Sequence, residues 1–191
     1  MLKHITIEGV RNLAHTQVAL PAGATVLFGA NGSGKTSFLE AIHLLAVGRS
    51  FRTHQSKPVI QHGMAHCRVV GEVQRGRRPT VMGLEKHRDG GVKARVGGEN
   101  VPSLSELALH LPLVLLDTEG LGIVTGPPEG RRRLLDGTLF HVEQGFLPQW
   151  KRYALAVRQR NSGLRRGILS SDKAWRQEIA ETGTLLTQQR Q

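Results

Sequence analysis

The sequence predicts an α/β fold, in which a first lobe of strands with one early helix is followed by a second, helical lobe. Segments before residue 21 and between residues 68 and 96 alternate apolar and polar side chains, the period of half-buried strands. A helical spacing of apolar residues begins at Lys35 and returns after about residue 146. The order of strands, helix, strands and helices therefore defines two lobes.

The first predicted strands contain Ile5 and Ile7, then Val18 and Leu20, with the corner Arg11-Asn12-Leu13 between them. Ala24-Thr25-Val26-Leu27-Phe28 follows a Pro-Ala-Gly turn. This short apolar run is typical of a buried central strand. We expect it to lead into the site described below.

The early helix is predicted from Lys35 because Phe38, Ala41, Ile42 and Leu45 stand at i, i+3, i+4 and i+7 and share one face. Gly48 is well placed to end it, since glycine readily adopts the left-handed conformation of a helix C-terminus.

The rest of the first lobe is predicted to be mostly strands. Residues 68–73 and 80–85 form a hairpin with a basic tip, and residues 92–96 alternate before a Gly-Gly turn. Ser103-Leu104-Ser105-Glu106 is a capping-box pattern that predicts a short helix to about His110. Leu113-Val114-Leu115-Leu116 is a second buried-strand candidate.

The second lobe is predicted to be an antiparallel pair of helices. The first carries a rough apolar stripe, and the second begins after Ser171-Asp172 and reaches Gln191 without a Gly, Asn or Pro stop signal. We therefore expect a chain cut within an element. The predicted domains are 1–110, a connecting segment 111–130, and an incomplete helical hairpin 131–191. The two stripes are Phe146, Trp150, Tyr153, Val157 and Leu164, then Trp175, Ile179, Thr182 and Leu186.

The composition indicates a polyanionic partner. The 191 residues carry 26 Lys+Arg against 15 Asp+Glu, a formal net charge of +11. No apolar run approaches the roughly 20 residues of a membrane span, so no membrane association is expected. The single cysteine, Cys67, excludes an internal disulfide framework and fits a reducing cytoplasm.

The most informative stretch satisfies G-x-x-x-x-G-K-[ST] before a predicted helix. Its glycines let successive N–H groups point at phosphate oxygens, and the helix N-terminus adds its dipole. Lys35 is expected to bridge the β- and γ-phosphates of ATP, and the Thr36 hydroxyl to ligate Mg²⁺. The nucleotide-binding residues are predicted to be Gly29, Ala30, Asn31, Gly32, Ser33, Gly34, Lys35 and Thr36.

The wider pattern resembles a known family. The Arg11-Asn12 corner, the loop form G-x-N-G-x-G-K-[ST] and Phe38-Leu39-Glu40-Ala41-Ile42 are similar to the head of the SMC and RecF group of ABC-type ATPases. Residues 48–53, 119–121 and 126–136, and Arg158-Gln159-Arg160-Asn161, look like stretches of the RecF family. The resemblance covers almost the whole chain and implies an ABC-type P-loop ATPase head lacking its C-terminal part.

The resemblance implies an ATP-dependent DNA-binding protein of recombinational repair, acting in DNA replication, DNA repair and the SOS response in the cytoplasm. It implies that Arg11 and Asn12 belong to the nucleotide site. It also implies single-stranded or gapped duplex DNA as the partner, and an ATP-dependent homodimer. RecO/RecR-type mediators and RecA are further implied partners. No catalytic residue is assigned, because the chain lacks the L-S-x-G-Q signature and Val114 and Thr118 depart from the family pattern. At most weak ATPase activity is expected.

Two alternatives stay open. Leu113–Leu116 followed by Asp117 could be a Walker B strand, with Glu119 as the base that orients water, in a self-contained small P-loop NTPase. Thr118 stands where that base usually follows the aspartate, which favours placing the strand at the lobe boundary instead. The other alternative is a non-catalytic truncated remnant.

Three basic clusters are candidate DNA contacts, and we hypothesise that they border one channel. Each could instead be a solvated face, and the cluster at 131–133 could pair with Asp136. His62, His66 and Cys67 lack the paired short spacings of a structural zinc site. The DNA candidates are Arg131, Arg132 and Arg133; Lys151, Arg152 and Arg158; and Arg75, Arg77 and Arg78.

Overall fold

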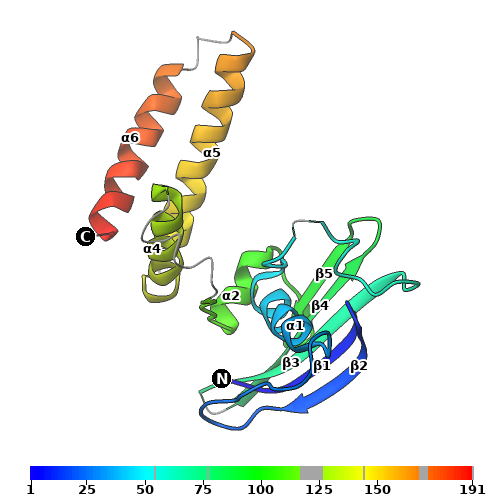
Figure 1. The fold of residues 1–191 in the computed structure, drawn as a ribbon. Coiled ribbons are helices and arrows are strands. Elements are labelled where there is room, and N and C mark those ends of the chain that lie inside the picture. The colour runs from blue at the N-terminus through cyan, green and yellow to red at the C-terminus, as the bar shows by residue number, and fades with distance from the viewer. Residues whose placement is uncertain (54, 77, 117–126, 144, 168–171, 191) are drawn as a thin grey trace. The chain divides into compact units, whose positions relative to one another are not determined.

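The computed structural model describes residues 1–191 except 54, 77, 117–126, 144, 168–171 and 191. The chain divides into two compact units, Met1–Val114 and Leu115–Gln191, each of which is described by itself (Figure 1). The first unit is α/β and the second is helical, which confirms the predicted fold class.

The first unit is built on a six-stranded sheet in the order β2-β1-β3-β4-β5-β6, with every neighbouring pair antiparallel. The predicted strand pair, hairpin and strand at 92–96 are all present. The two-residue strand β6, too short to leave a pattern, was not predicted. The strands are β1 (Leu2–Val10), β2 (Leu13–Ala19), β3 (His66–Arg75), β4 (Arg78–His87), β5 (Val92–Val96) and β6 (Glu99–Asn100).

Helix α1 (Lys35–Val47) packs on one face of this sheet (Figure 1). Its predicted apolar face is buried at Phe38, Ala41 and Leu45. Gly48 ends the helix in the left-handed conformation, at φ 76°, and donates its N–H to Leu44 O. The sheet and helix share one core, to which β1, β3, β4 and α1 contribute Ile5, Ile7, Val10, Val69, Val73, Met82, Leu84, Leu44 and Leu45.

The short helix predicted after Ser103 is present as a 3₁₀ turn, Leu104–Glu106, followed by α2 (Leu107–His110). The Ser103 hydroxyl accepts from the N–H of Ser105 at 3.4 Å. That is one residue short of the capping-box bond, because the first turn is a tighter 3₁₀ turn.

Two predicted buried strands are wrong. Residues 24–28 form no strand and Phe28 is 91% exposed; residues 113–116 form none either, and Leu116 is 81% exposed. An apolar run indicates burial only if a neighbouring strand is available to pair with it. No described segment lies beside either run in the sheet order of the first unit. The phosphate loop therefore follows a segment outside the sheet.

The second unit contains α4 (Pro128–Val142), α5 (Phe146–Arg165) and α6 (Asp172–Gln189). Helices α5 and α6 lie side by side and antiparallel, as predicted (Figure 1). The α6 stripe is confirmed by the burial of Thr182 and Leu186. The α5 stripe is partly wrong, because Trp150 and Leu164 are exposed, and the indole of Trp150 reaches Asp136 of α4 instead, at 3.2 Å.

Candidate functional site

The phosphate loop, residues 29–36, joins the segment after β2 to the first turn of α1. Gly29, Gly32 and Gly34 have φ of 144°, 80° and 103°, a region that side-chain-bearing residues avoid, which explains the glycine spacing. Lys35 Nζ donates to the carbonyls of Gly29 and Ala30, both at 2.8 Å, so its ammonium lies over the start of the loop.

The N-terminus of α1 is suited to an anion. Gly34 is its N-cap, no side chain caps it, and its first turn holds no acidic residue. The unpaired N–H groups and the positive end of the dipole are therefore left for a phosphate. Thr36 stands exposed in this turn, next to Lys35, as a Mg²⁺-ligating hydroxyl would have to be. The residues present fit a nucleotide with its Mg²⁺.

The corner between β1 and β2 packs against the loop. Asn12 Nδ2 donates to Gly32 O at 2.9 Å, and Asn12 Oδ1 accepts from the Ser37 hydroxyl at 2.7 Å. A Cβ at Gly34 would stand 2.7 Å from Leu13 Cδ2, so the corner and the loop are in close contact. The structure thus places the predicted Asn12 on the loop backbone.

Arg11, also predicted for the nucleotide site, forms an ion pair with α1, and its contact with a nucleotide stays a prediction. Its Nε and Nη2 donate to Glu40 of α1 at 2.9 and 2.8 Å, in a two-pronged ion pair. Glu40 is fully buried and also accepts from the Ser50 hydroxyl at 2.5 Å, while Arg52 Nη1 stands 3.6 Å away. Arg11 therefore binds a carboxylate of the helix that starts at the loop.

Burial would raise the pKa of Glu40, but the hydrogen bonds from Arg11 and Ser50 and the charges of Arg11 and Arg52 outweigh it and lower that pKa below 4.5. Glu40 is therefore ionised at neutral pH. Sequence reasoning missed Glu40, Ser50 and Arg52 as a cluster. One signal was available, since Glu40 is the only acidic residue in a predicted helix made mostly of apolar residues.

The Walker B alternative cannot be placed on this site. Asp117, Thr118 and Glu119 lie outside the described residues. Only the preceding run is described, and its exposed Val114 and Leu116 do not belong to a strand.

The basic clusters lie on both units. In the first unit, β3 ends at Arg75 and β4 begins at Arg78, with Gly76 in the turn and Arg77 outside the described residues. In the second unit, Arg131 and Arg132 are exposed near the start of α4, and Lys151 and Arg158 are exposed on α5. A common channel stays a hypothesis.

Arg152 and Asp136, two charged residues of the second unit considered above, form ion pairs within that unit. Arg152 donates to Glu178 of α6 at 2.9 Å, so it ties the hairpin. Asp136, predicted as an alternative partner for residues 131–133, pairs with Arg190 at 2.7 Å. Lys151 and Arg158 make no such bond within the described part of the chain, and remain the better DNA candidates of α5.

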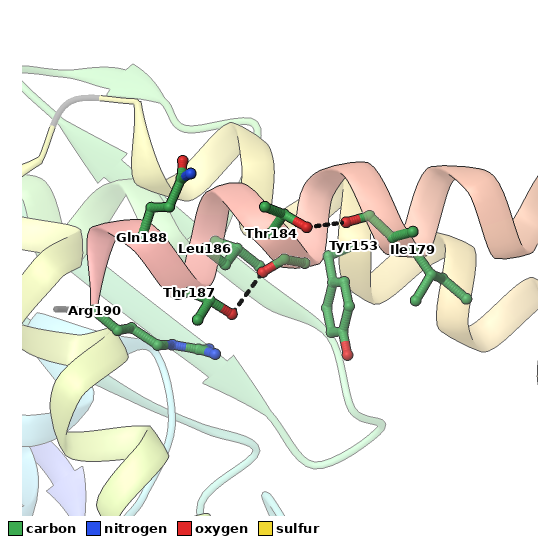
Figure 2. A pocket seen from close by; sticks show the side chains of 9 residues that line it. Tyr153, Ile179, Thr184, Leu186, Thr187, Gln188 and Arg190 are labelled. Carbon is green, nitrogen blue, oxygen red and sulfur yellow. Dashed lines mark hydrogen bonds between the residues drawn. The ribbon is translucent and has the colours of Figure 1, made fainter.

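A groove of about 430 Å³ runs along the α5–α6 hairpin (Figure 2). It forms where Gly183 of α6 faces Tyr153 of α5, since a Cβ on Gly183 would stand 3.4 Å from the ring. The hydroxyls of Thr184 and Thr187 donate to carbonyls of their own helix at 2.8 Å each. These two hydroxyls of the groove are therefore already bonded, and its Arg190 is paired with Asp136.

Other site types find little support. The residues that the structure describes contain no group of three or more His, Cys, Asp or Glu side chains able to hold a metal. Burial raises the pKa of the Cys67 thiol to about 11, so this thiol is not a nucleophile. Among the described helices, none is both long enough and apolar enough to cross a bilayer.

Comparison with known proteins gives one consistent answer. The family model described as RecF/RecN/SMC N terminal domain matches residues 1–126. The DNA replication and repair proteins RecF of Pseudomonas putida (strain W619) and Azotobacter vinelandii are each 44% identical over 181 residues, 93% of this chain. Those alignments span 49% and 50% of the relatives, so the chain spans about half the length of the curated relatives it matches.

A solved structure of the recombination mediator protein RecF with ATP, from the RecFOR pathway, matches the fold of the chain with a TM-score of 0.89 at 25% identity. The match covers 99% of this chain and 52% of that one. The SMC head of Pyrococcus furiosus matches with a TM-score of 0.59 at 16% identity, a likeness of fold alone.

Proposed function

The chain belongs to the family of RecF/RecN/SMC N-terminal domains, and we propose that it is a RecF-like, ATP-dependent DNA-binding protein of recombinational repair. The observation that carries the proposal is the phosphate loop at residues 29–36, braced by Asn12 and opening onto the uncapped N-terminus of α1. The similarity to RecF proteins over 93% of the chain supports the same function.

In this proposal the loop amides and the first turn of α1 bind the phosphates of ATP, and the Lys35 ammonium leaves Gly29 and Ala30 to bridge the β- and γ-phosphates. The Thr36 hydroxyl would hold Mg²⁺, which would neutralise phosphate charge. Asn12 holds the loop at the carbonyl of Gly32. The described residues supply a binding site, and no base for hydrolysis is assigned among them.

The DNA partner is single-stranded or gapped duplex DNA, contacted by the basic clusters of both units. A net charge of +11 favours a polyanion, because each Lys or Arg that neutralises a phosphate releases counterions. By similarity to RecF, ATP binding drives homodimerisation, and RecO/RecR-type mediators and RecA are the protein partners. Roles in DNA replication, DNA repair and the SOS response, in the cytoplasm, follow from the same similarity.

ATP binding is tested by equilibrium titration of the purified chain with ATP and Mg²⁺, comparing Lys35→Ala with Lys57→Ala. Lys57 is an exposed lysine of the same unit, outside the loop. We expect Lys35→Ala to weaken binding by about a hundredfold, since it removes a charge-assisted contact to phosphate. Equal affinities for the wild type and Lys35→Ala would contradict the proposed site.

The same samples separate the alternatives. Binding without turnover is expected here, because no catalytic residue is assigned. Steady ATP hydrolysis without DNA or a partner would instead favour a self-contained small NTPase using Asp117 and Glu119. Absence of ATP binding by the wild type would favour a non-catalytic remnant.

DNA contact is tested by the salt dependence of binding to gapped DNA. The charge reversals Lys151→Glu and Arg158→Glu are compared with Lys173→Glu, an exposed lysine on α6. Each lost phosphate contact should flatten the slope of log K against log salt by about 0.9 on duplex DNA and about 0.7 on single strands. If α5 and the clusters at 75–78 and 131–133 can all be reversed with no change of slope, the DNA surface lies elsewhere.

A further inference from the structure

We infer that Glu40 is a positioning residue for the nucleotide site: it holds the Arg11–Asn12 corner against the phosphate loop, so that ATP affinity depends on a carboxylate that touches no phosphate. The inference rests on the proposed ATP binding. It concerns how the loop is held in shape, through the cluster of Glu40, Arg11, Ser50 and Arg52.

The corner needs to be held because its backbone is strained. Arg11 has φ 54°, and it is the only residue other than glycine with positive φ among the described residues. Its N–H donates to Val59 O at 2.8 Å, and its guanidinium donates twice to Glu40. The ion pair therefore lies at the position where the chain would otherwise relax.

The spacing of Ser37 and Glu40 on α1 links that ion pair to the phosphate loop. Ser37 and Glu40 stand at i and i+3, on one face of the helix. Ser37 binds Asn12, and Glu40 binds the preceding residue, Arg11. Two consecutive corner residues are thus fixed to two consecutive turns of the helix, and Asn12 then reaches Gly32 in the loop. Release of Arg11 would loosen Asn12.

A second segment is attached to the same carboxylate. The Ser50 hydroxyl donates to Glu40 and accepts from the N–H groups of Arg52 and Thr53, at 2.9 and 3.2 Å. The ring of His43, one turn after Glu40, contacts Arg49 O at 2.6 Å and Phe51 edge-on. The segment after α1 is therefore folded back onto the helix beside Glu40.

Charge makes Glu40 hard to replace. It is fully buried, with one guanidinium in two-pronged contact and a second at 3.6 Å. Glutamine keeps the shape and an acceptor oxygen but removes the charge, so Arg11 would be left without its counter-ion. The glutamine variant therefore tests charge-dependent positioning with little change of volume.

The experiment measures ATP affinity and amide hydrogen exchange in the wild type, Glu40→Gln and Glu8→Gln. Glu8 is the control: it accepts from Arg68 Nε at 3.0 Å and forms an ion pair with Arg68 Nη2 at 2.8 Å on the same sheet, and no hydrogen bond joins it to residues 29–36 among the described residues. We expect Glu40→Gln to bind ATP about tenfold more weakly, a change of about 1.4 kcal/mol. Amides 11–13 and 32–34 should exchange faster in this variant alone.

A double-mutant cycle distinguishes positioning from general stability. If Glu40 acts through the corner, Asn12→Ala should lower affinity much less in the Glu40→Gln background than in the wild type, whereas independent effects would add. Should Glu40→Gln fail to fold, Ser50→Ala removes one bond to the carboxylate and should shift the same amides in the same direction.

Unchanged affinity and unchanged exchange in Glu40→Gln would overturn the inference, as would additive effects in the cycle. Failure of the proposed function gives a different result, namely a wild type that does not bind ATP. In that case the exchange of amides 11–13 and 32–34 still decides whether Glu40 holds the corner.

Discussion

Gly34 joins two constraints in one residue, a φ of 103° and a close approach to Leu13. Gly32, two residues earlier, also has positive φ, at 80°, but a Cβ there would meet nothing within 4 Å. Substitutions at Gly32 and Gly34 therefore distinguish the cost of backbone strain from the cost of packing against the corner.

We expect Gly32→Ala to lower the free energy of unfolding by about 1–2 kcal/mol, the cost of a left-handed alanine. Gly34→Ala should cost that amount plus about 1–3 kcal/mol of overpacking, because its Cβ would stand 2.7 Å from Leu13 Cδ2. Urea denaturation of the two variants measures the difference. Equal losses would mean that the corner does not press on the loop.

The lowered pKa of Glu40 makes a prediction about acid stability. A carboxyl group whose pKa is lower in the folded state stabilises the fold above its unfolded pKa, and this contribution is lost as the pH falls through the folded pKa. For Glu40 that loss begins below the ordinary value of 4.5.

We therefore expect Glu40→Gln to be less stable than the wild type at neutral pH, with the gap narrowing as the pH falls below the ordinary glutamate value of 4.5. Urea melts at a series of pH values measure it, provided that both proteins unfold reversibly. A gap of constant size down to the acid transition would show that the charge of Glu40 does not stabilise the fold.

At this scale the sequence predicted the glycine turn and the helix start at Lys35, because such a turn is local: its glycines, lysine and hydroxyl are neighbours in the chain. It did not predict the partners of Arg11. Arg11 and Glu40 are 29 residues apart, and Ser50 is 10 residues beyond Glu40. Only the folded corner brings them together, so a motif could suggest Arg11 as functional but not what it binds.

Among the elements, β3 and α1 approach each other closely at Gly71. A Cβ at Gly71 would stand 2.5 Å from Leu45 Cδ2 and 2.8 Å from Leu2 Cδ1, although the backbone there is ordinary strand. Gly83, on the neighbouring strand β4, would meet only Val70 Cγ2 at 3.9 Å, an ordinary contact.

We expect Gly71→Ala to destabilise the first unit by about 1–3 kcal/mol, since the buried side chains of Leu45 and Leu2 would have to repack. Gly83→Ala should be neutral or stabilising by up to about 1 kcal/mol, because alanine restricts the unfolded chain without a clash. Thermal or urea unfolding compares them. If both variants lose the same stability, packing of α1 on Gly71 is not the cause.

The two wrongly predicted strands show where an apolar sequence pattern alone fails to predict a strand. The pattern of β1, with alternating burial, predicted a strand whose partners β2 and β3 are present. Residues 24–28 and 113–116 are as apolar, but the described chain supplies them with no partner in the sheet. A strand is a property of a pair of segments, whereas an apolar run is a property of one.

For the molecule as a whole, charge and apolar surface act against each other. The net charge of +11 opposes self-association through repulsion. Val26 and Phe28 are 78% and 91% exposed, and consecutive exposed apolar residues favour association. Repulsion reaches about 30 Å at 0.01 M salt but only about 3 Å at 1 M, whereas apolar contact does not weaken with salt.

The chain should therefore be monodisperse at low salt and associate as salt is raised, the reverse of an association held by surface ion pairs. Static light scattering across a salt series measures this. Val26→Ser should reduce the association, whereas the matched Val81→Ser, at a single exposed valine on β4 that is 54% exposed, should leave it nearly unchanged. A monomer at every salt concentration, or an equal effect of the two substitutions, would mean that the run at 26–28 is not what brings chains together.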